Sequence, residues 1–275
     1  MGSPPRRTLF ATDLDGTLLR SDGTISPRSR AAIQAAQNDG APVVFVTARP
    51  PRVVRDLAEE AGLTGPVVCS NGAILYDVAR DEVLHHERLG GGLALELSLA
   101  LRSLEPQVVF ATEHGHRIGY EPTFPRIFED DVPEHLSPVG DVQWLCEAEL
   151  TKLIVHHPDQ DPDALAAWIG AHVGERAFVT HSGGPFVEIG AVGVSKASGL
   201  ARLCEELGIP PADVVAFGDM PNDLPMLAFA GLGVAVANAH PAVLAAADEI
   251  APSNDEDGVA RTIERLLAAT AVQTG

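Results

Sequence analysis

An acidic turn directly after a buried strand constrains this chain more than any other feature. The apolar run 9–12 predicts a buried strand, and Asp13, Asp15 and Gly16 follow it. Side chains two residues apart on a strand point to the same side, so we expect the two carboxylates to face one spot. In open α/β sheets, ligands bind outside the carboxyl ends of the strands. An ordinary turn remains the alternative on these residues alone, because Asp and Gly are common in turns.

The overall composition is that of a globular protein. Of the 275 residues, 45% are hydrophobic and 21% are charged, which provides enough core material for one or two domains. The formal net charge of −19 repels nucleic acid and anionic membranes, and no apolar run approaches the roughly 20 residues of a membrane span. We therefore expect no nucleic-acid or membrane partner and a monomer or weak homodimer. An anionic substrate would need a metal ion or local cations in its pocket.

The cysteines and the first residues favour a cytoplasmic protein. Cys69, Cys146 and Cys204 are scattered, and no Cys-x-x-Cys motif suggests a zinc site or a disulfide framework. Reduced, buried thiols are typical of the cytoplasm. The arginine pair at 6–7 lies too close to Asp13 for the apolar region of a signal peptide to intervene.

Strand and helix signals alternate at both ends of the chain. Apolar runs predict strands at 9–12, 42–47, 66–70, 214–217 and 233–236. Capping residues, prolines and glycines predict helices at 27–39, 50–61, 195–207, 224–230, 241–247 and 257–269. Strands separated by helices indicate an α/β fold with a doubly wound parallel sheet.

The alternation of strand and helix signals changes between residues 80 and 188. The residues from 74 to 88 predict a hairpin or an extended arm, and helices are expected at 93–104 and 161–173. Short strands are predicted at 107–112, 117–120, 150–157, 176–180 and 186–189. This α+β segment predicts an inserted domain at 80–188, with residues 1–79 and 189–275 forming the other domain. An insertion at this edge of the sheet can cover the site as a lid.

Polar residues follow four of the strands predicted for the parallel sheet. They are Asp13, Asp15, Thr47, Ser70, Asn71, Asp219, Asn222 and Asp223. Because the carboxyl ends of parallel strands lie at one edge, we expect these side chains to converge. Mg²⁺ binds a few protein oxygens and keeps several waters, so Asp13 and Asp219 are candidate ligands. The alternative for residues 218–223 is a turn with a helix N-cap.

These residues suit phosphoryl transfer through a covalent intermediate. An ionised Asp13 can attack phosphorus, and Asp15 can protonate the leaving alkoxide and then take a proton from water. Lys196 lies in the first turn of a predicted helix, where the dipole disfavours a cation unless an anion is near. Lys196 and Mg²⁺ would neutralise the two anionic reactants. A solvated Lys196 and a purely structural, β-branched Thr47 are the alternatives.

The motifs resemble those of the haloacid dehalogenase (HAD) superfamily of phosphatases. Asp13-Leu-Asp15-Gly-Thr17 is similar to the first motif of that superfamily, Thr47 to the second, Lys196 to the third and residues 218–223 to the fourth. An insertion between the second and third motifs resembles the Cof-type subgroup, which has a C2-type α/β cap. The resemblance implies a Rossmann-like core and a cap that sets the substrate.

The resemblance also implies a role for each motif residue. Asp13 would be the nucleophile and Asp15 the general acid and base. Mg²⁺ would be bound by the Asp13 carboxylate, the Asp15 backbone carbonyl and Asp219, and Asp223 would either support the metal as a ligand or contact its ligands. The remaining motif residues would contact the phosphoryl group or the substrate, and they are Thr47, Lys196 and Asn222.

The expected reaction is hydrolysis of a small phosphorylated metabolite, with sugar phosphates foremost. A phosphomutase or phosphotransferase would use the same aspartyl-phosphate but return the phosphoryl group to a sugar. A non-catalytic small-molecule sensor that keeps the pocket is a further alternative. In the inserted segment, His114, His116, Arg117 and Tyr120 are candidates to meet the substrate, or else they form a solvated hairpin.

Overall fold

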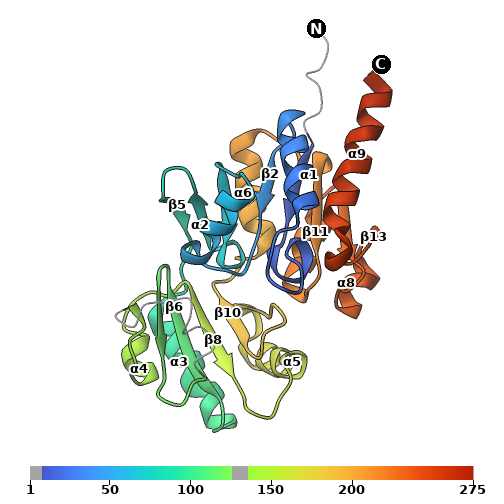
Figure 1. Cartoon of the computed structure of the whole chain (residues 1–275). Helices are drawn as coiled ribbons and strands as arrows, with labels where there is room; N and C mark the ends of the chain where they lie inside the picture. The colour runs from blue at the N-terminus through green and yellow to red at the C-terminus, as the bar shows by residue number, and fades with distance from the viewer. Residues whose placement is uncertain (1–7, 126–135, 275) are drawn as a thin grey trace.

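The computed structural model of the chain describes residues 8–125 and 136–274, with side chains to residue 269. A five-stranded parallel sheet lies at the centre of the larger part (Figure 1). Its order is β13-β12-β11-β1-β2, formed by β1 (Leu9–Thr12), β2 (Val43–Phe45), β11 (Val214–Gly218), β12 (Leu232–Val236) and β13 (Glu249–Ala251). This sheet confirms the predicted α/β fold class. Strand β13 was not predicted.

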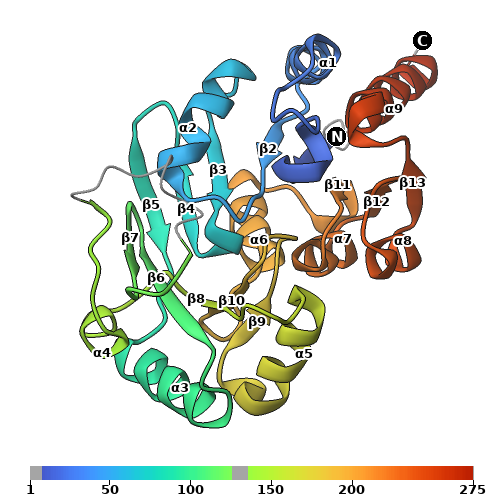
Figure 2. The ribbon, with the colours of Figure 1, turned by 60° about the horizontal axis from the view of Figure 1, so that its bottom comes forward.

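Helices cover both faces of this sheet. They are α1 (Pro27–Asn38), α2 (Pro51–Glu60), α6 (Lys196–Leu207), α7 (Leu224–Phe229), α8 (Pro241–Ala246) and α9 (Gly258–Thr274). Helix α1 packs against α9 and α6 packs against α7, and Figure 2 shows these two pairs on opposite sides of β2 and β11. The Ser26 hydroxyl caps α1 by accepting a hydrogen bond from the Ser29 backbone N–H at 2.9 Å, as its sequence predicts.

Strand β3 (Pro66–Cys69) was predicted to belong to the parallel sheet, but it does not pair along its length with β2. Only an isolated parallel bridge, between Val46 and Val68, connects it to the end of β2. Its ladder is antiparallel, with β4 (Ile74–Asp77), which pairs in turn with β5 (Glu82–His86). The physical reason is the short turn 70–72 between β3 and β4, because so tight a connection can join only antiparallel strands.

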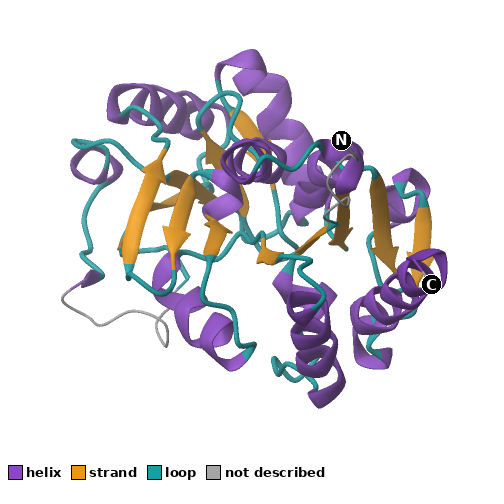
Figure 3. Ribbon diagram, turned by 90° about the horizontal axis from the view of Figure 1, so that it is seen from above, coloured by secondary structure: helices purple, strands orange, loops and turns teal. Residues whose placement is uncertain are grey.

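The remaining strands form a second, antiparallel sheet of order β7-β6-β8-β10-β9. Its strands are β6 (Val109–His114), β7 (Arg117–Tyr120), β8 (Lys152–His156), β9 (Phe178–Thr180) and β10 (Val187–Gly190). It is accompanied by helices α3 (Gly91–Leu104), α4 (Val142–Leu145) and α5 (Pro162–Val173). Seen from above, the helices lie mainly around the strands (Figure 3).

The buried apolar side chains form separate clusters. One cluster draws on residues 9–78 and 194–263, and another on residues 89–189. A smaller cluster lies between residues 111 and 154. The division of the chain into two domains at 80–188 stays a prediction. Within the part of the chain that the structure describes, no helix has both the length and the apolar character needed to cross a bilayer.

Candidate active site

The turn after β1 brings its first acidic side chain against the end of β11. The Asp13 backbone N–H donates to the Phe217 carbonyl at 3.0 Å, which ties the two strand ends together. Gly16 has a φ of +72°, and a Cβ at this position would collide with the Asp219 carboxylate. Thr17 then donates from Oγ1 to Asp219 Oδ1 at 2.7 Å. Gly16 is therefore required by both its backbone conformation and its close neighbour.

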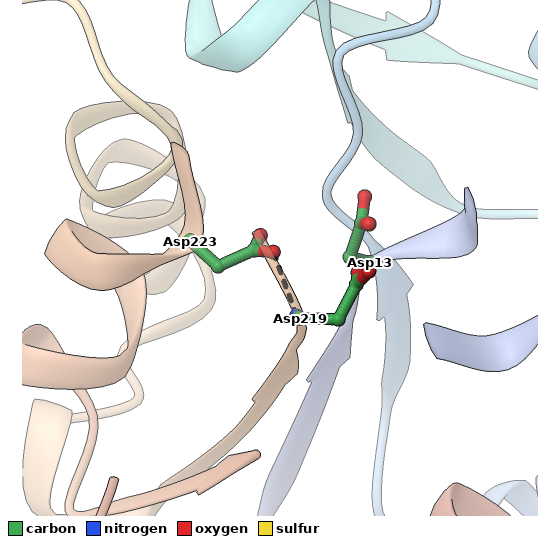
Figure 4. A group of neighbouring side chains, drawn as sticks. All are labelled: Asp13, Asp219 and Asp223. Atoms are coloured by element: carbon green, nitrogen blue, oxygen red, sulfur yellow. Dashed lines mark hydrogen bonds between the residues drawn. The ribbon is translucent and has the colours of Figure 1, made fainter. Parts of the chain in front are cut away.

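The end of β11 contributes two more carboxylates. Asp223 Oδ2 accepts hydrogen bonds from the backbone N–H groups of Asp219 and Met220, both at 3.0 Å. One oxygen from each of Asp13, Asp219 and Asp223 lies within 4.8 Å of the others, and all three residues are buried. Figure 4 shows Asp13 and Asp219 at neighbouring strand ends, with the bond to Asp223 drawn. We call these three residues the acidic triad.

Lys196 is fully buried at the start of α6, and it is not a surface lysine. Its Nζ donates to Asp13 Oδ1 and to Asp223 Oδ1, both at 2.6 Å. Burial opposes the charged form, but the two carboxylates outweigh burial and raise the pKa of Lys196. The unfavourable position of a cation at a helix N-terminus is thus offset by two ion pairs.

The acidic triad has more negative charge than its single lysine can balance. Burial raises the pKa of Asp13 well above its usual value; Lys196 opposes this, and Asp223 and Asp219 add to it. Burial and the Asp223 carboxylate also raise the pKa of Asp219 to about 7. A divalent cation would remove this repulsion, and an all-oxygen donor set suits a hard ion such as Mg²⁺. The residues present therefore fit a hard metal ion.

Asp15 lies in a different environment from Asp13. Its carboxylate is 49% exposed and accepts hydrogen bonds from Arg49 Nε at 2.7 Å and Arg49 Nη2 at 2.5 Å. We expected Asp13 and Asp15 to face the same side because side chains two residues apart on a strand do so. That alternation does not extend to Asp15, because β1 ends at Thr12. One carboxylate is thus buried beside a lysine, and the other is half exposed and held by an arginine.

Thr47 and Asn222 lie at the same edge of the sheet. Thr47 is fully buried, and its Oγ1 accepts a hydrogen bond from the Arg49 backbone N–H at 3.1 Å. Asn222 donates from Nδ2 to Asn71 Oδ1 at 3.0 Å. Among the residues that the structure describes, Asn222 Oδ1 is buried and has no hydrogen-bond partner. The structure thus brings the predicted residues of the four motifs to one region.

The turn after β3 links this region to the second sheet. Ser70 and Asn71 have φ values of +49° and +56°, and Gly72 follows at +95°. Ser70 Oγ donates to Glu113 Oε1 at 2.7 Å, and Asn71 Nδ2 donates to Glu188 Oε2 at 2.9 Å. Consecutive left-handed residues other than glycine are rare, so these contacts accompany a costly backbone conformation.

A cavity of about 400 Å³ separates the loop after Thr47 from the second sheet. Its charged lining consists of Asp15, Arg49, Arg52, Glu113, Lys152 and Glu188. Of these six residues, Asp15 was predicted from the sequence and the other five were not. Lys152 on β8 and Glu188 on β10 adjoin apolar residues, and a charge beside an apolar run was the available signal. Glu113 on β6 lies between Thr112 and His114 and has no such signal. Glu113 and Lys152 are also cross-strand neighbours in the β6–β8 register, which requires knowledge of the pairing.

The cluster predicted in this sheet is not part of the cavity lining. His114, His116, Arg117 and Tyr120 are all absent from its walls. His114 instead contacts the Glu149 carbonyl and the Thr112 hydroxyl, both at 3.1 Å. Successive side chains on a strand point to opposite faces, so Glu113 faces the cavity and its neighbour His114 does not.

Comparison with known proteins gives consistent matches along nearly the whole chain. The profile of the haloacid dehalogenase-like hydrolases matches residues 10–263. The 5-amino-6-(5-phospho-D-ribitylamino)uracil phosphatase YitU of Bacillus subtilis is 31% identical, over 94% of this chain and 97% of that protein. The pyridoxal phosphate phosphatase YbhA of Escherichia coli is 30% identical, over 93% of this chain and 97% of that protein. A solved haloacid dehalogenase-like hydrolase from B. subtilis superposes with a TM-score of 0.80 at 28% identity. The match covers 94% of this chain and 99% of that structure.

Proposed function

The chain belongs to the haloacid dehalogenase-like hydrolase family, and on this premise we propose that it is a Mg²⁺-dependent phosphatase of small phosphorylated metabolites. The two relatives compared above are phosphatases, and the chain is accordingly a phosphoric monoester hydrolase. We further propose that sugar phosphates are its substrates. The reaction would proceed through an aspartyl-phosphate on Asp13.

The single observation that carries this proposal is the unbalanced acidic triad. Three buried carboxylates and one buried lysine are a poor arrangement for stability alone, because uncompensated buried charge is costly. The same arrangement is useful where a metal ion and a phosphoryl group must be bound together. Asp13 and Asp219 would hold the metal ion, with Asp223 and the Asp15 carbonyl in support. When bound, Mg²⁺ would supply positive charge to the phosphoryl oxygens.

Asp13 is placed to act as the nucleophile. Lys196 binds Asp13 Oδ1 and favours the ionised form, which leaves the second carboxylate oxygen for attack on phosphorus. As the Asp13 oxygen–phosphorus bond forms, the bond from phosphorus to the leaving alcohol breaks. Lys196, Thr47 and Asn222 would donate hydrogen bonds to the phosphoryl oxygens or the substrate.

Asp15 is proposed to move the protons. It protonates the departing alkoxide, and its carboxylate then takes a proton from the water that attacks phosphorus. That second attack breaks the Asp13–phosphorus bond, restores the Asp13 carboxylate and releases inorganic phosphate. Arg49 donates two hydrogen bonds to the Asp15 carboxylate and so holds it at the edge of the site.

We also propose that residues 80–188 form a cap over a catalytic core made of residues 1–79 and 189–275. The separate apolar clusters support this division. The bonds from Ser70 and Asn71 to Glu113 and Glu188 support a closed arrangement. A cytoplasmic location and a monomeric or weakly dimeric state remain proposals of the same kind.

The test is phosphate release from a panel of phosphate monoesters, with Mg²⁺ and then with a chelator. We expect release that requires the metal and a ranking in which sugar phosphates lead. Phosphate transfer to a second sugar, without net release, would instead favour the mutase or phosphotransferase. An absence of release and transfer with every ester, at several metal concentrations, would contradict the proposed function.

A further inference from the structure

The charged groups lining the cavity are matched in number. Three cations face three carboxylates, and each cation has a carboxylate oxygen within 4.0 Å. Arg49 pairs with Asp15, Lys152 pairs with Glu188, and the Arg52 guanidinium lies 4.0 Å from Glu113. This lining contrasts with the acidic triad, where carboxylates exceed cations. The cavity therefore offers no surplus positive charge to a substrate.

Lys152 uses two of its three N–H donors on neighbouring groups. Its Nζ donates to Glu188 Oε1 and to the Ala48 carbonyl at 2.9 Å, and Glu113 Oε2 lies 3.8 Å away. Burial disfavours the charged form, but Glu113 and Glu188 outweigh burial and raise the pKa of Lys152. A second anion on the substrate would have to take this ammonium from carboxylates that are themselves buried.

Glu113 and Glu188 differ in how their oxygens are used. Both Glu188 oxygens accept hydrogen bonds, one from Lys152 and one from Asn71. Glu113 Oε1 accepts from Ser70, but the cations nearest to Oε2 are at 3.8 and 4.0 Å. Among the described residues, no group donates a hydrogen bond to Glu113 Oε2. The side chain is only 3% exposed, and its Oε2 at the cavity wall has unused accepting capacity.

We propose that Glu113 is a specificity-determining residue that accepts a hydrogen bond from a hydroxyl of the leaving group. The cavity then takes phosphate monoesters of neutral, hydroxyl-bearing alcohols and rejects esters that carry a second phosphate or a carboxylate. A hydroxyl satisfies Glu113 Oε2, whereas a second anion repels it and finds no free cation. The inference rests on the proposed phosphatase function and deepens it.

The experiment compares matched esters that differ only in a second anionic group. Suitable pairs are glucitol 6-phosphate with 6-phosphogluconate, and glucose 6-phosphate with glucose 1,6-bisphosphate. We expect the wild-type kcat/KM to favour the neutral member roughly tenfold or more, since an unpaired buried polar group is a strong basis for rejection. Where one ester of a pair is not turned over, the inhibition constants of both esters against p-nitrophenyl phosphate hydrolysis are compared instead.

Two variants separate the role of Glu113 from a general loss of structure. Glu113→Gln keeps the side-chain shape and removes the charge, so the preference for the neutral ester should fall at least severalfold. Glu121→Gln is the matched control, because Glu121 is buried in the same sheet region but bonds Arg102 and the Phe110 N–H outside the cavity lining. Its substrate ratio should equal that of the wild type.

The outcomes distinguish this inference from the proposed function. Phosphate release with a wild-type ratio near one, or with the same ratio in Glu113→Gln, would overturn the role of Glu113. An enzyme that releases no phosphate from any ester would overturn the proposed function instead. A ratio that falls in Glu113→Gln and is retained in Glu121→Gln supports the inference.

Discussion

Two neighbouring charge clusters, the acidic triad and the charged lining of the cavity, differ in balance. The acidic triad combines three carboxylates with Lys196 alone. The cavity lining combines equal numbers of carboxylates and cations. An unbalanced cluster needs an ion from solution, whereas a balanced cluster can discriminate among neutral groups by hydrogen bonding. The difference suggests that one cluster performs the chemistry and the other selects the substrate.

The largest effect is expected from removing the nucleophile of the unbalanced cluster. Asp13→Asn should lower phosphate release by roughly three orders of magnitude or more, as the loss of a nucleophile typically does. It should not lower the thermal unfolding midpoint of the metal-free protein, because it removes a charge that burial and two other carboxylates disfavour. Activity assays and thermal unfolding of the same preparation measure both effects. Metal-dependent turnover by this variant would contradict the mechanism.

Metal binding should stabilise the unbalanced cluster. At a Mg²⁺ concentration of one hundred times Kd, binding to the folded state alone adds about 2.7 kcal/mol to the free energy of unfolding. We expect the unfolding midpoint to rise with Mg²⁺ in the wild type and to change little in Asp219→Asn. The control is Glu121→Gln, which should respond to Mg²⁺ as the wild type does. An equal response in Asp219→Asn would place the metal elsewhere.

The same cluster predicts a pH dependence for the metal-free protein. The Asp219 pKa of about 7 lies above its unfolded value of about 3.9, so the folded state holds this proton more tightly. The resulting stabilisation is complete below about pH 4 and is lost as pH rises through about 7. Relative to Asp219→Asn, wild-type stability should therefore fall by on the order of 2 kcal/mol between pH 5 and 8. Denaturant unfolding at several pH values tests this, and a rise would contradict it.

A smaller effect is expected where the balanced cluster meets the turn after β3. Ser70→Ala removes the donor to Glu113 Oε1 and leaves that buried oxygen unsatisfied. We expect a loss of roughly 1 to 2 kcal/mol in the free energy of unfolding. Ser103→Ala is the control, because the exposed Ser103 hydroxyl donates to the Ala100 carbonyl of its own helix. Equal stability of the two variants would show that the contact contributes nothing.

Much of the fold could be predicted because its strands are apolar runs with clear helix caps between them. Ser26 is one example, and its capping bond is present. Strand β13 was missed because Glu249–Ala251 is only three residues long and includes a glutamate. The antiparallel pairing of β3 was missed because it depends on a turn whose geometry, with two left-handed residues other than glycine, has no reliable sequence signal.

The candidate site divides in the same way. Asp13, Thr47 and Asp219 follow apolar strands, so the topology of a parallel sheet was enough to predict their convergence. Glu113 and Lys152 lie within strands of another sheet, and their meeting depends on the β6–β8 register and on how that sheet faces the core. Neither the strand register nor the face that the sheet turns to the core can be deduced from the local sequence pattern.

The turn at Ser70, Asn71 and Gly72 also has a thermodynamic meaning. A left-handed conformation costs about 1 to 2 kcal/mol for each residue other than glycine. The hydrogen bonds that Ser70 and Asn71 donate to Glu113 and Glu188 offset this cost. The turn and the placement of the second sheet therefore form one cooperative unit. If residues 80–188 were deleted, the chain would lose the bonds that favour this turn, and the loop beside Thr47 would lose a preorganised neighbour.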